Sequence, residues 1–407
     1  MLKKYSFLVI LFLLLTACTP ETKPVVIATI FPEDFENSIY MNEYNQDVEI
    51  RSILSSIDEV DQHWHNLDDV INNYIKENKD VDIVYGFPNY YLQGIVDEGN
   101  IKQLNGLLDE SILNNIAPAV MTPIKKAGND NIYGLTPMFQ NNVLVYNKDI
   151  FEELNMEQPQ DSLKWEELLT IANKINNTSE YKGLTLGYAT TNSDYFYMIQ
   201  GLADPIDRIE NIGGKAVVNN EVNRKFWKIF ADIYKENEKV TTEEFIKGEV
   251  AMSIFPIGQL IDTEILKYYS SDVDISKWGI VETPVFEENK GGSAYTDTMF
   301  ILSSYSKNDN AVKFLEYIHG KEFAVSLVNS EMFPSYWDNE IKSIFMEKYD
   351  VDLSAAYMQP GALSSIPPFE GERVREIEAV GAKIFDRYLS GDGNLNDLLI
   401  EYEESIN

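Results

Sequence analysis

The folded part of the chain starts with a regular alternation of apolar runs and amphipathic segments. Residues 25–30, 47–54 and 81–85 are predicted to be strands, and residues 67–75 carry apolar side chains at the period of a helix. Strands separated by helices favour parallel pairing, because the helix returns the chain to the same edge of the sheet. This pattern predicts an α/β domain, with ligands expected at the carboxyl ends of its strands.

The same pattern begins again further along the chain. Strands are expected at residues 143–146, 184–188 and 250–255, and helices at 165–175, 222–233 and 374–389. Gly391 follows the last of these helices and is a typical helix stop. Two consecutive series of strands and helices predict two α/β lobes, each a mixed sheet flanked by helices, which agrees with the length of the chain.

The first eighteen residues have the parts of an export signal. Lys3 and Lys4 precede an apolar run over residues 7–15, and small residues follow it up to Cys18. The run is shorter than the ~20 apolar residues that a transmembrane helix needs. Residues 15–18, Leu-Thr-Ala-Cys, resemble a bacterial lipobox, in which the cysteine is lipidated and becomes the first residue of the mature chain.

We therefore expect residues 1–17 to be removed as a lipoprotein signal peptide and residues 18–24 to form a short tether. Cys18 is the only cysteine of the chain, and it occupies the one position that a lipobox requires. The alternative is an ordinary cleaved signal in which Cys18 is incidental. The lipobox interpretation predicts an extracytoplasmic protein held at the cell membrane through the lipid on Cys18.

Charge and cysteine content exclude several classes of function. The formal net charge of −33 becomes −35 after cleavage, because Lys3 and Lys4 leave and no acid does. A surface this acidic repels phosphate backbones and anionic headgroups, so we expect no nucleic-acid partner and no membrane attachment through a basic patch. One cysteine permits no disulfide framework and no zinc site built on cysteine pairs.

Sequence signatures of catalysis are absent. The chain has no Gly-x-Ser-x-Gly elbow, no Walker loop, no His-Glu-x-x-His helix and no nucleotide-binding glycine fingerprint. His63 and His65 could form a metal pair, but no third nitrogen or sulfur ligand is near them in sequence. Residues 392–403 match part of a calcium loop, yet Asp397 stands where that loop needs glycine, so Asn394 or Asn396 is interpreted as a helix cap. We expect no metal and no cofactor.

A set of short strings, in order along the chain, resembles one family, the extracellular solute-binding proteins of the maltose-binding type. The strings cover most of the mature chain, and each is weak by itself. They are Asp82-Ile83-Val84; Ile132 to Leu135 with Pro137; Tyr146 to Asp149; Trp165 with Glu167; Lys247 to Met252; and Ser306 to Asn308 before the helix face of Ala311, Phe314, Leu315 and Ile318.

The sequence also departs from the pattern of that family. Val81 stands where the family usually has proline, and Lys164 where it usually has a threonine cap. The tryptophan that often stacks on sugar after the Gly-x-x-Ala-Met strand is missing, and Phe255 to Gln259 occupy that stretch. The ligand therefore differs from maltodextrins, or Phe255 takes over the stacking role.

The resemblance implies a two-lobed periplasmic-binding-protein fold of type II, in which solute is held between lobes joined by hinge strands. The chain would cross between the lobes near residues 134–139, 279–285 and 329–335. Lobe I is then expected to comprise residues 25–136 and 284–331, and lobe II residues 137–283 and 332–407.

The resemblance also implies a set of ligand-binding residues, which would supply aromatic faces for apolar C–H patches and polar groups for hydroxyls. For any one aromatic residue, core packing is about as plausible as ligand contact. Trp165 and Trp278 are assigned to packing, and Trp337 is left open. The expected ligand-binding residues are Phe31, Glu33, Trp64, Phe87, Asn89, Tyr90, Gln140, Tyr195, Phe255, Gln259, Tyr295, Asp297, Phe369 and Arg373.

These features predict a monomeric, lipid-anchored receptor, not an enzyme, that captures a carbohydrate and delivers it to the permease subunits of an ABC importer. The same fold could instead serve a polyamine or another small polar solute, an alternative that the acids Glu33 and Asp297 leave open. Two further alternatives come from other classes. One is a surface glycoside hydrolase that uses a carboxylate pair, and the other is an envelope scaffold that binds no solute.

Overall fold

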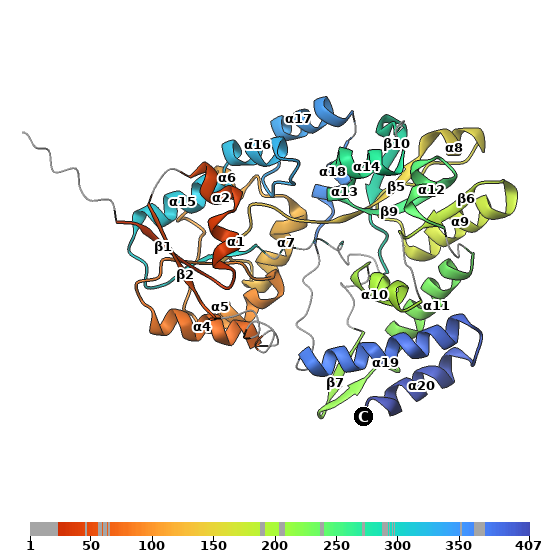
Figure 1. The fold of residues 1–407 in the computed structure, drawn as a ribbon, viewed down its shortest axis with the longest axis horizontal. Helices are drawn as coiled ribbons and strands as arrows, with labels where there is room; N and C mark the ends of the chain where they lie inside the picture. Colours follow the sequence, from red (N-terminus) through yellow and green to blue (C-terminus); the bar gives the residue numbers. More distant parts are fainter. Residues whose placement is uncertain are drawn as a thin grey trace, which may run out of the picture.

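The computed structural model has two α/β lobes (Figure 1). Lobe I carries the N-terminal strands and lobe II carries the C-terminal helices. The described residues are 23–44, 47–55, 59, 63, 66–187, 192–202, 208–236, 240–270, 273–286, 292, 294, 296, 298–350, 352–361 and 371–407. The structure thus has the two-lobed, mixed α/β architecture that the sequence predicts.

Lobe I is built on a five-stranded sheet in the order β2-β1-β3-β11-β4. Its strands are β1 (Val25–Thr29), β2 (Val48–Ser52), β3 (Ile83–Tyr85), β4 (Gly134–Leu135) and β11 (Phe300–Leu302). β1 pairs in parallel with β2 and β3, as the alternating pattern predicts. β11 runs antiparallel to both β3 and β4, so the chain enters this sheet from the other direction when it returns.

The helices of lobe I follow the same alternation. They are α1 (Pro32–Glu36), α2 (Ile39–Glu43), α4 (Leu67–Glu77), α5 (Leu92–Asp97), α6 (Glu110–Leu113), α7 (Pro118–Ala127), α15 (Asp309–His319) and α16 (Lys321–Asn329), with a 3-10 turn at Asn89–Tyr91. α4 buries Leu67, Ile71 and Ile75, the predicted apolar face.

Lobe II is built on a four-stranded sheet in the order β10-β5-β9-β6. Its strands are β5 (Asn142–Asn147), β6 (Lys182–Thr185), β9 (Val250–Pro256) and β10 (Trp278–Glu282). β5 is antiparallel to both β9 and β10, whereas β6 is parallel to β9. The strand predicted at residues 184–188 is β6. It begins two residues earlier than predicted, at Lys182, and within the described residues it ends at Thr185.

Helices and one hairpin complete lobe II. The helices are α8 (Lys148–Glu153), α9 (Trp165–Thr178), α10 (Asn192–Leu202), α11 (Glu221–Glu236), α12 (Thr242–Ile246), α13 (Ile257–Ile261), α14 (Thr263–Tyr269), α19 (Gly371–Leu389) and α20 (Leu395–Ser405), with a 3-10 turn at Ile275–Lys277; the hairpin is β7 (Glu210–Ile212) with β8 (Lys215–Val217). Asn394 caps α20 by accepting from the Asp397 N–H at 3.1 Å, which confirms the cap interpretation of this stretch.

Two backbone segments run side by side between the lobes. The Phe139 N–H donates to the Phe333 carbonyl at 3.2 Å, and the Ser335 N–H donates to the Pro137 carbonyl at 2.7 Å. α17 (Asn339–Tyr349) and α18 (Ser354–Met358) follow the second of these segments. α17 packs against α16 of lobe I, whereas α18 contacts both α7 of lobe I and β5 and β10 of lobe II.

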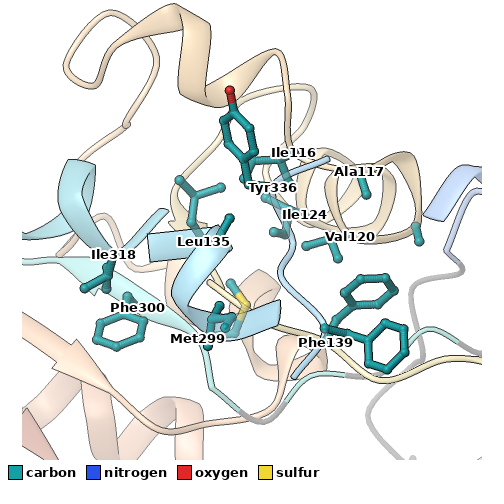
Figure 2. Packing of buried hydrophobic residues seen from close by; sticks show 14 of the residues in the cluster. Ile116, Ala117, Val120, Ile124, Leu135, Phe139, Met299, Phe300, Ile318 and Tyr336 are labelled. Carbon is teal, nitrogen blue, oxygen red and sulfur yellow. The ribbon is translucent and has the colours of Figure 1, made fainter. Parts of the chain in front are cut away.

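Two clusters of buried apolar side chains form the core. The first fills lobe I and continues through α17 and α18 to one face of the lobe II sheet, while the second fills the other face of that sheet and the C-terminal helices. Figure 2 shows part of the first cluster, where Leu135 and Met299 lie near Ile124 of α7. Trp165 and Trp278 are 0% and 4% exposed, which confirms that both are packing residues.

A buried carboxylate joins the start of the fold to its return strand. Asp82 accepts from the Val26 N–H at 3.1 Å, from the Ser306 hydroxyl at 2.6 Å and from Asn308 Nδ2 at 2.9 Å. The side chain is 1% exposed. Two of the strings that carry the family resemblance, residues 82–84 and 306–308, therefore meet in space around one carboxylate.

Asp82→Ala is expected to lower the free energy of unfolding by about 3 kcal/mol or more, because three buried donors lose their acceptor at about 1–3 kcal/mol each. Urea unfolding followed by circular dichroism measures this. Asp80→Ala is the matched control, since Asp80 is exposed and forms a surface ion pair with Arg51 at 2.8 Å, and it should change stability by less than about 1 kcal/mol. Equal effects of the two substitutions would contradict this role of Asp82.

Candidate functional site

The carboxyl ends of β1 and β3 lie together at one edge of the lobe I sheet. The two strands are parallel and in register, with Thr29 beside Tyr85, so the residues after each strand emerge at the same place. Phe31 follows β1, and Phe87, Asn89 and Tyr90 follow β3. Gly86 has φ +93, and a Cβ there would lie 3.1 Å from Thr29 Oγ1, so a larger residue would be strained at this edge.

Three threonine hydroxyls gather at the same edge. β4 is parallel to β3 through β11, so Thr136 after β4 and Thr296 and Thr298 before β11 come together there. Thr136 Oγ1 donates to the Met138 carbonyl at 2.6 Å and lies 2.9 Å from Thr296 Oγ1 and 2.8 Å from Thr298 Oγ1. The Asn89 N–H donates to the Thr296 carbonyl at 3.1 Å, which ties this group to the predicted site residues.

The sequence prediction missed these threonines, although Thr136 lies inside one of the matched strings. Threonine is common in strands and turns, so nothing in its spacing marks it as a site residue. The only available signal was position, because all three residues flank strands of one sheet.

Gln140 and Gln259 lie together at an edge of the lobe II sheet. β5 begins where antiparallel β9 ends, with Asn142 beside Pro256. The Ile257 N–H donates to the Asn141 carbonyl at 2.9 Å, and a Cβ at Gly258 would lie 3.1 Å from Gln140 Oε1. Gln140 and Gln259 are both exposed.

The two edges are consecutive along the chain. β4 ends at Leu135 in the lobe I sheet, and β5 starts at Asn142 in the lobe II sheet. Residues 136–141 therefore lead directly from the threonine group to Gln140. The predicted residues from the two lobes thus lie at sheet edges that this short connection joins.

Three of the predicted aromatic residues lie in the hydrophobic core. Phe87 is 0% exposed, Phe255 is 1% exposed and Tyr195 is 5% exposed. Phe255 packs between Phe245 and Trp278, with ring centroids 5.5 and 6.1 Å away. A ring buried in this way has no face open for a sugar, so in this conformation Phe255 does not replace the missing tryptophan.

Tyr195 is held in the core by a specific hydrogen bond. Its hydroxyl donates to the Phe230 carbonyl at 2.8 Å, and its ring lies 4.9 Å from that of Tyr234. Burial raises the pKa of the Tyr195 hydroxyl well above its usual value, because the phenolate would be desolvated. The residue therefore acts as a neutral packing group.

The remaining predicted residues differ in accessibility. Phe31 and Tyr90 are half-buried, Glu33 is exposed, and Asn89 is 5% exposed. Arg373 forms an ion pair with Glu376 at 3.2 Å and donates to the Ile406 carbonyl, so it holds α19 to the end of the chain. Five predicted positions lie outside the described residues: Cys18, Trp64, Tyr295, Asp297 and Phe369.

The described residues contain no group of three or more histidine, cysteine, aspartate or glutamate side chains arranged to hold a metal ion. His63 Nδ1 lies 3.3 Å from Asn66 Oδ1, and its neighbour His65 is outside the described residues. His319 is 1% exposed, and its Nδ1 lies 2.8 Å from the Leu315 carbonyl. Burial lowers the pKa of His319 to about 4, so the imidazole is neutral at physiological pH and belongs to the core.

A family model described as bacterial extracellular solute-binding protein matches residues 43–329. The match covers well over half of the chain. The chain belongs to this family. This solute-binding protein is therefore extracytoplasmic and a binding protein rather than an enzyme, as the sequence predicts. No helix among the described residues is both long and apolar enough to cross a membrane.

Solved structures agree with the fold at low sequence identity. A sugar transporter from Rhizobium etli in an open conformation matches with a TM-score of 0.58 and 17% identity over 95% of this chain and 99% of the other. The cyclic α-maltosyl-1,6-maltose binding protein of Arthrobacter globiformis matches with a TM-score of 0.55 and 15% identity, covering 95% and 98%. A solute-binding protein from Agrobacterium vitis with bound D-mannitol gives 0.52 and 14%, covering 94% and 97%. Among curated proteins, no sequence matches this chain.

Tyr195→Phe separates the packing role of this residue from ligand contact. The substitution removes the hydrogen bond to Phe230 and should lower the free energy of unfolding by about 1 kcal/mol. The affinity for whichever solute stabilises the wild-type protein should stay unchanged. Urea unfolding and isothermal titration calorimetry measure the two quantities, and a tenfold loss of affinity without loss of stability would place Tyr195 in the site instead.

Proposed function

We propose that this solute-binding protein captures a carbohydrate, a mono- or oligosaccharide, between its two lobes and delivers it to the permease subunits of an ABC importer. The observation that carries the proposal is that two sheet edges, one from each lobe, are joined by residues 136–141 and carry both aromatic and amide side chains. Sugars present apolar C–H faces and many hydroxyls, and such a mixture of side chains suits both.

The relatives of known structure support the choice of solute class. Three of them are a sugar transporter, a cyclic α-maltosyl-1,6-maltose binding protein and a solute-binding protein with bound D-mannitol. All three are below 25% identical to this chain, so by themselves they support only the fold. The proposed solute class rests mainly on the side chains of the candidate site, and the solutes of these three proteins agree with it. The individual sugar is the question for experiment.

The proposed site consists of residues from both lobes that solute can reach. From lobe I it takes Phe31, Glu33 and Tyr90, and from lobe II it takes Gln140 and Gln259. Asn89 is 5% exposed and supports the lobe I edge through the hydrogen bond from its N–H to the Thr296 carbonyl. A solute that contacts both lobes favours the closed arrangement by its differential affinity for that state, and a permease can distinguish closed from open. We keep the predicted lobe boundaries as part of this proposal, with α17 and α18 at the junction of the two lobes.

A thermal-shift screen of the mature chain against a sugar library tests the solute class. At 100 times its dissociation constant, a bound sugar should add about 2.7 kcal/mol to the free energy of unfolding. The library includes polyamines and amino acids as controls of another class. Stabilisation by a polyamine with no response to any saccharide would overturn the carbohydrate assignment and favour the cationic alternative.

Tyr90→Ala and Gln259→Ala test the site with the best sugar of that screen. Each should weaken binding by about fivefold, since an aromatic contact or a hydrogen bond contributes about 1 kcal/mol. Tyr268→Ala is the matched control, because Tyr268 on α14 is 84% exposed and lies outside the proposed site. Calorimetry that finds the control as damaging as the site variants would contradict the placement of the site.

We also propose that Cys18 carries a lipid that holds the receptor at the membrane, close to its permease. Tethering raises the effective concentration of a receptor at its partner without any new contact. Cys18→Ala should release the protein from the membrane fraction and impair uptake in cells, while calorimetry on the purified variant gives the wild-type affinity. Retention of the variant in the membrane fraction would rule out the lipid anchor.

A further inference from the structure

The junction of the lobes contains a buried glutamine whose side-chain amide hydrogen-bonds to both backbone groups of one residue, as a neighbouring strand would. Gln359 follows α18 and is 2% exposed. Its Oε1 accepts from the Thr283 N–H at 3.2 Å, and its Nε2 donates to the Thr283 carbonyl at 2.8 Å. Thr283 directly follows β10, where the chain leaves the lobe II sheet on its way to β11 of lobe I. One amide therefore satisfies both backbone groups of the residue that begins this connection.

The next two residues contact the same connection and lobe I. The Gly292 N–H donates to the Pro360 carbonyl at 2.9 Å, so a second point of the connection is paired to this segment. A Cβ at Gly361 would lie 2.0 Å from the Ala119 carbonyl oxygen and 3.2 Å from Pro123 Cδ, both in α7. Gln359 thus contacts the end of the lobe II sheet, Pro360 contacts the connection to lobe I, and Gly361 contacts α7 of lobe I.

α18 itself is held on both sides. Asn141 Nδ2 donates to the Ala356 carbonyl at 2.8 Å, which fixes the helix to the start of β5. The Tyr357 ring stacks on Trp337 with centroids 3.7 Å apart and meets the edge of Phe139 at 5.2 Å. Figure 2 shows Phe139 below α7, near Val120. The polar contacts of Asn141 and Gln359 reach toward lobe II, and the aromatic contacts reach toward the segments that cross between the lobes.

We propose that residues 359–361 set the angle between the lobes, with Gln359 as the positioning residue. A change in this angle moves the Thr283 backbone of lobe II relative to α7 of lobe I, and residues 359–361 contact both of them. Because both Thr283 groups are satisfied by one rigid amide, such a change leaves buried donors and acceptors unpaired unless the whole segment shifts. Residues 359–361 therefore confine the two lobes to few relative orientations. If these contacts are removed, the lobes populate more orientations.

The effect on solute affinity rests on the proposed function, but the effect on the lobes does not. A variant that changes the populations of solute-free arrangements changes affinity in proportion to the fraction that is competent to bind. The interlobe distance is therefore measured without any solute. A wrong solute assignment would then leave this test unaffected.

The experiment uses pulsed electron paramagnetic resonance on the mature chain from which Cys18 has been removed. This chain contains no other cysteine, so spin labels attach only at cysteines that are introduced. Spin labels are attached at Glu36→Cys in α1 and Glu152→Cys in α8, both exposed and on different lobes. Gln359→Met keeps the volume of the side chain and removes both hydrogen bonds. Gly361→Ala pushes the segment away from α7 and serves as the second variant.

The matched control is Gln200→Met. Gln200 is also buried, at 8% exposed, but it lies in α10 of lobe II and accepts from Arg208 at 2.9 Å. We expect Gln359→Met and Gly361→Ala to broaden or shift the interlobe distance distribution, while Gln200→Met leaves it as in the wild type. With the best sugar of the screen, the two junction variants should also change affinity by roughly tenfold.

Thermal unfolding of all variants distinguishes positioning from simple stability. A merely structural role predicts that Gln359→Met and Gln200→Met lower the melting temperature alike and leave the distance distribution unchanged. That result would overturn the proposal. If Gly361→Ala fails to fold, the comparison of Gln359→Met with Gln200→Met alone decides the outcome.

Discussion

The arrangement of this protein depends on one piece of backbone pairing. Residues 137–139 and 333–335 run antiparallel between the lobes, with Phe139 bonded to Phe333 and Ser335 to Pro137. The first segment leaves the carboxyl edge of the lobe I sheet and the second returns after α16, so the pair fixes both lobes to a common axis. The ring of Tyr357 in α18 packs against Trp337 and Phe139 beside this pair, whereas the amides of Gln140 and Gln259 are exposed.

Most of the fold could be predicted from the sequence, for a definite physical reason. Long elements with a clear apolar period, such as α4, α9, α11 and β9, were placed within a few residues, because burial of one face decides both their type and their position. The direction of strands was harder. Residues 300–302 form a strand of lobe I that runs antiparallel to its neighbours, and the pattern of apolar residues in three positions carries no information on direction. The short strings that resemble the family were more informative, since Asp82 and Asn308 are bonded to each other across more than two hundred residues of sequence.

The site could be predicted less well than the fold. Phe87, Tyr195 and Phe255 were expected as stacking groups, but an aromatic ring has the same character in a core as in a site, and the structure buries all three. Position just beyond a strand end does not decide the matter either, because Phe87 is buried there whereas Phe31 and Tyr90 are half-buried. The threonine group could not be predicted, since hydroxyls beside two separate strands, β4 and β11, converge only through the order of strands in the sheet. The junction contacts of Gln359 depend in the same way on tertiary structure.

The beginning of β1 lies at the opposite edge of the lobe I sheet from the threonine group. Asn308 Nδ2 donates to the Pro24 carbonyl at 2.9 Å, and Asn310 Nδ2 donates to the Lys23 carbonyl at 3.2 Å, so the entry of the chain is pinned there. The length of β1, about 17 Å for five residues, separates this point from the edge where β1 ends. A pull on the N-terminus therefore acts on the network around Asp82 and not on the lobe contacts. Coupling the protein to a sensor surface through its N-terminus therefore places the attachment at the edge of the lobe I sheet opposite the threonine group.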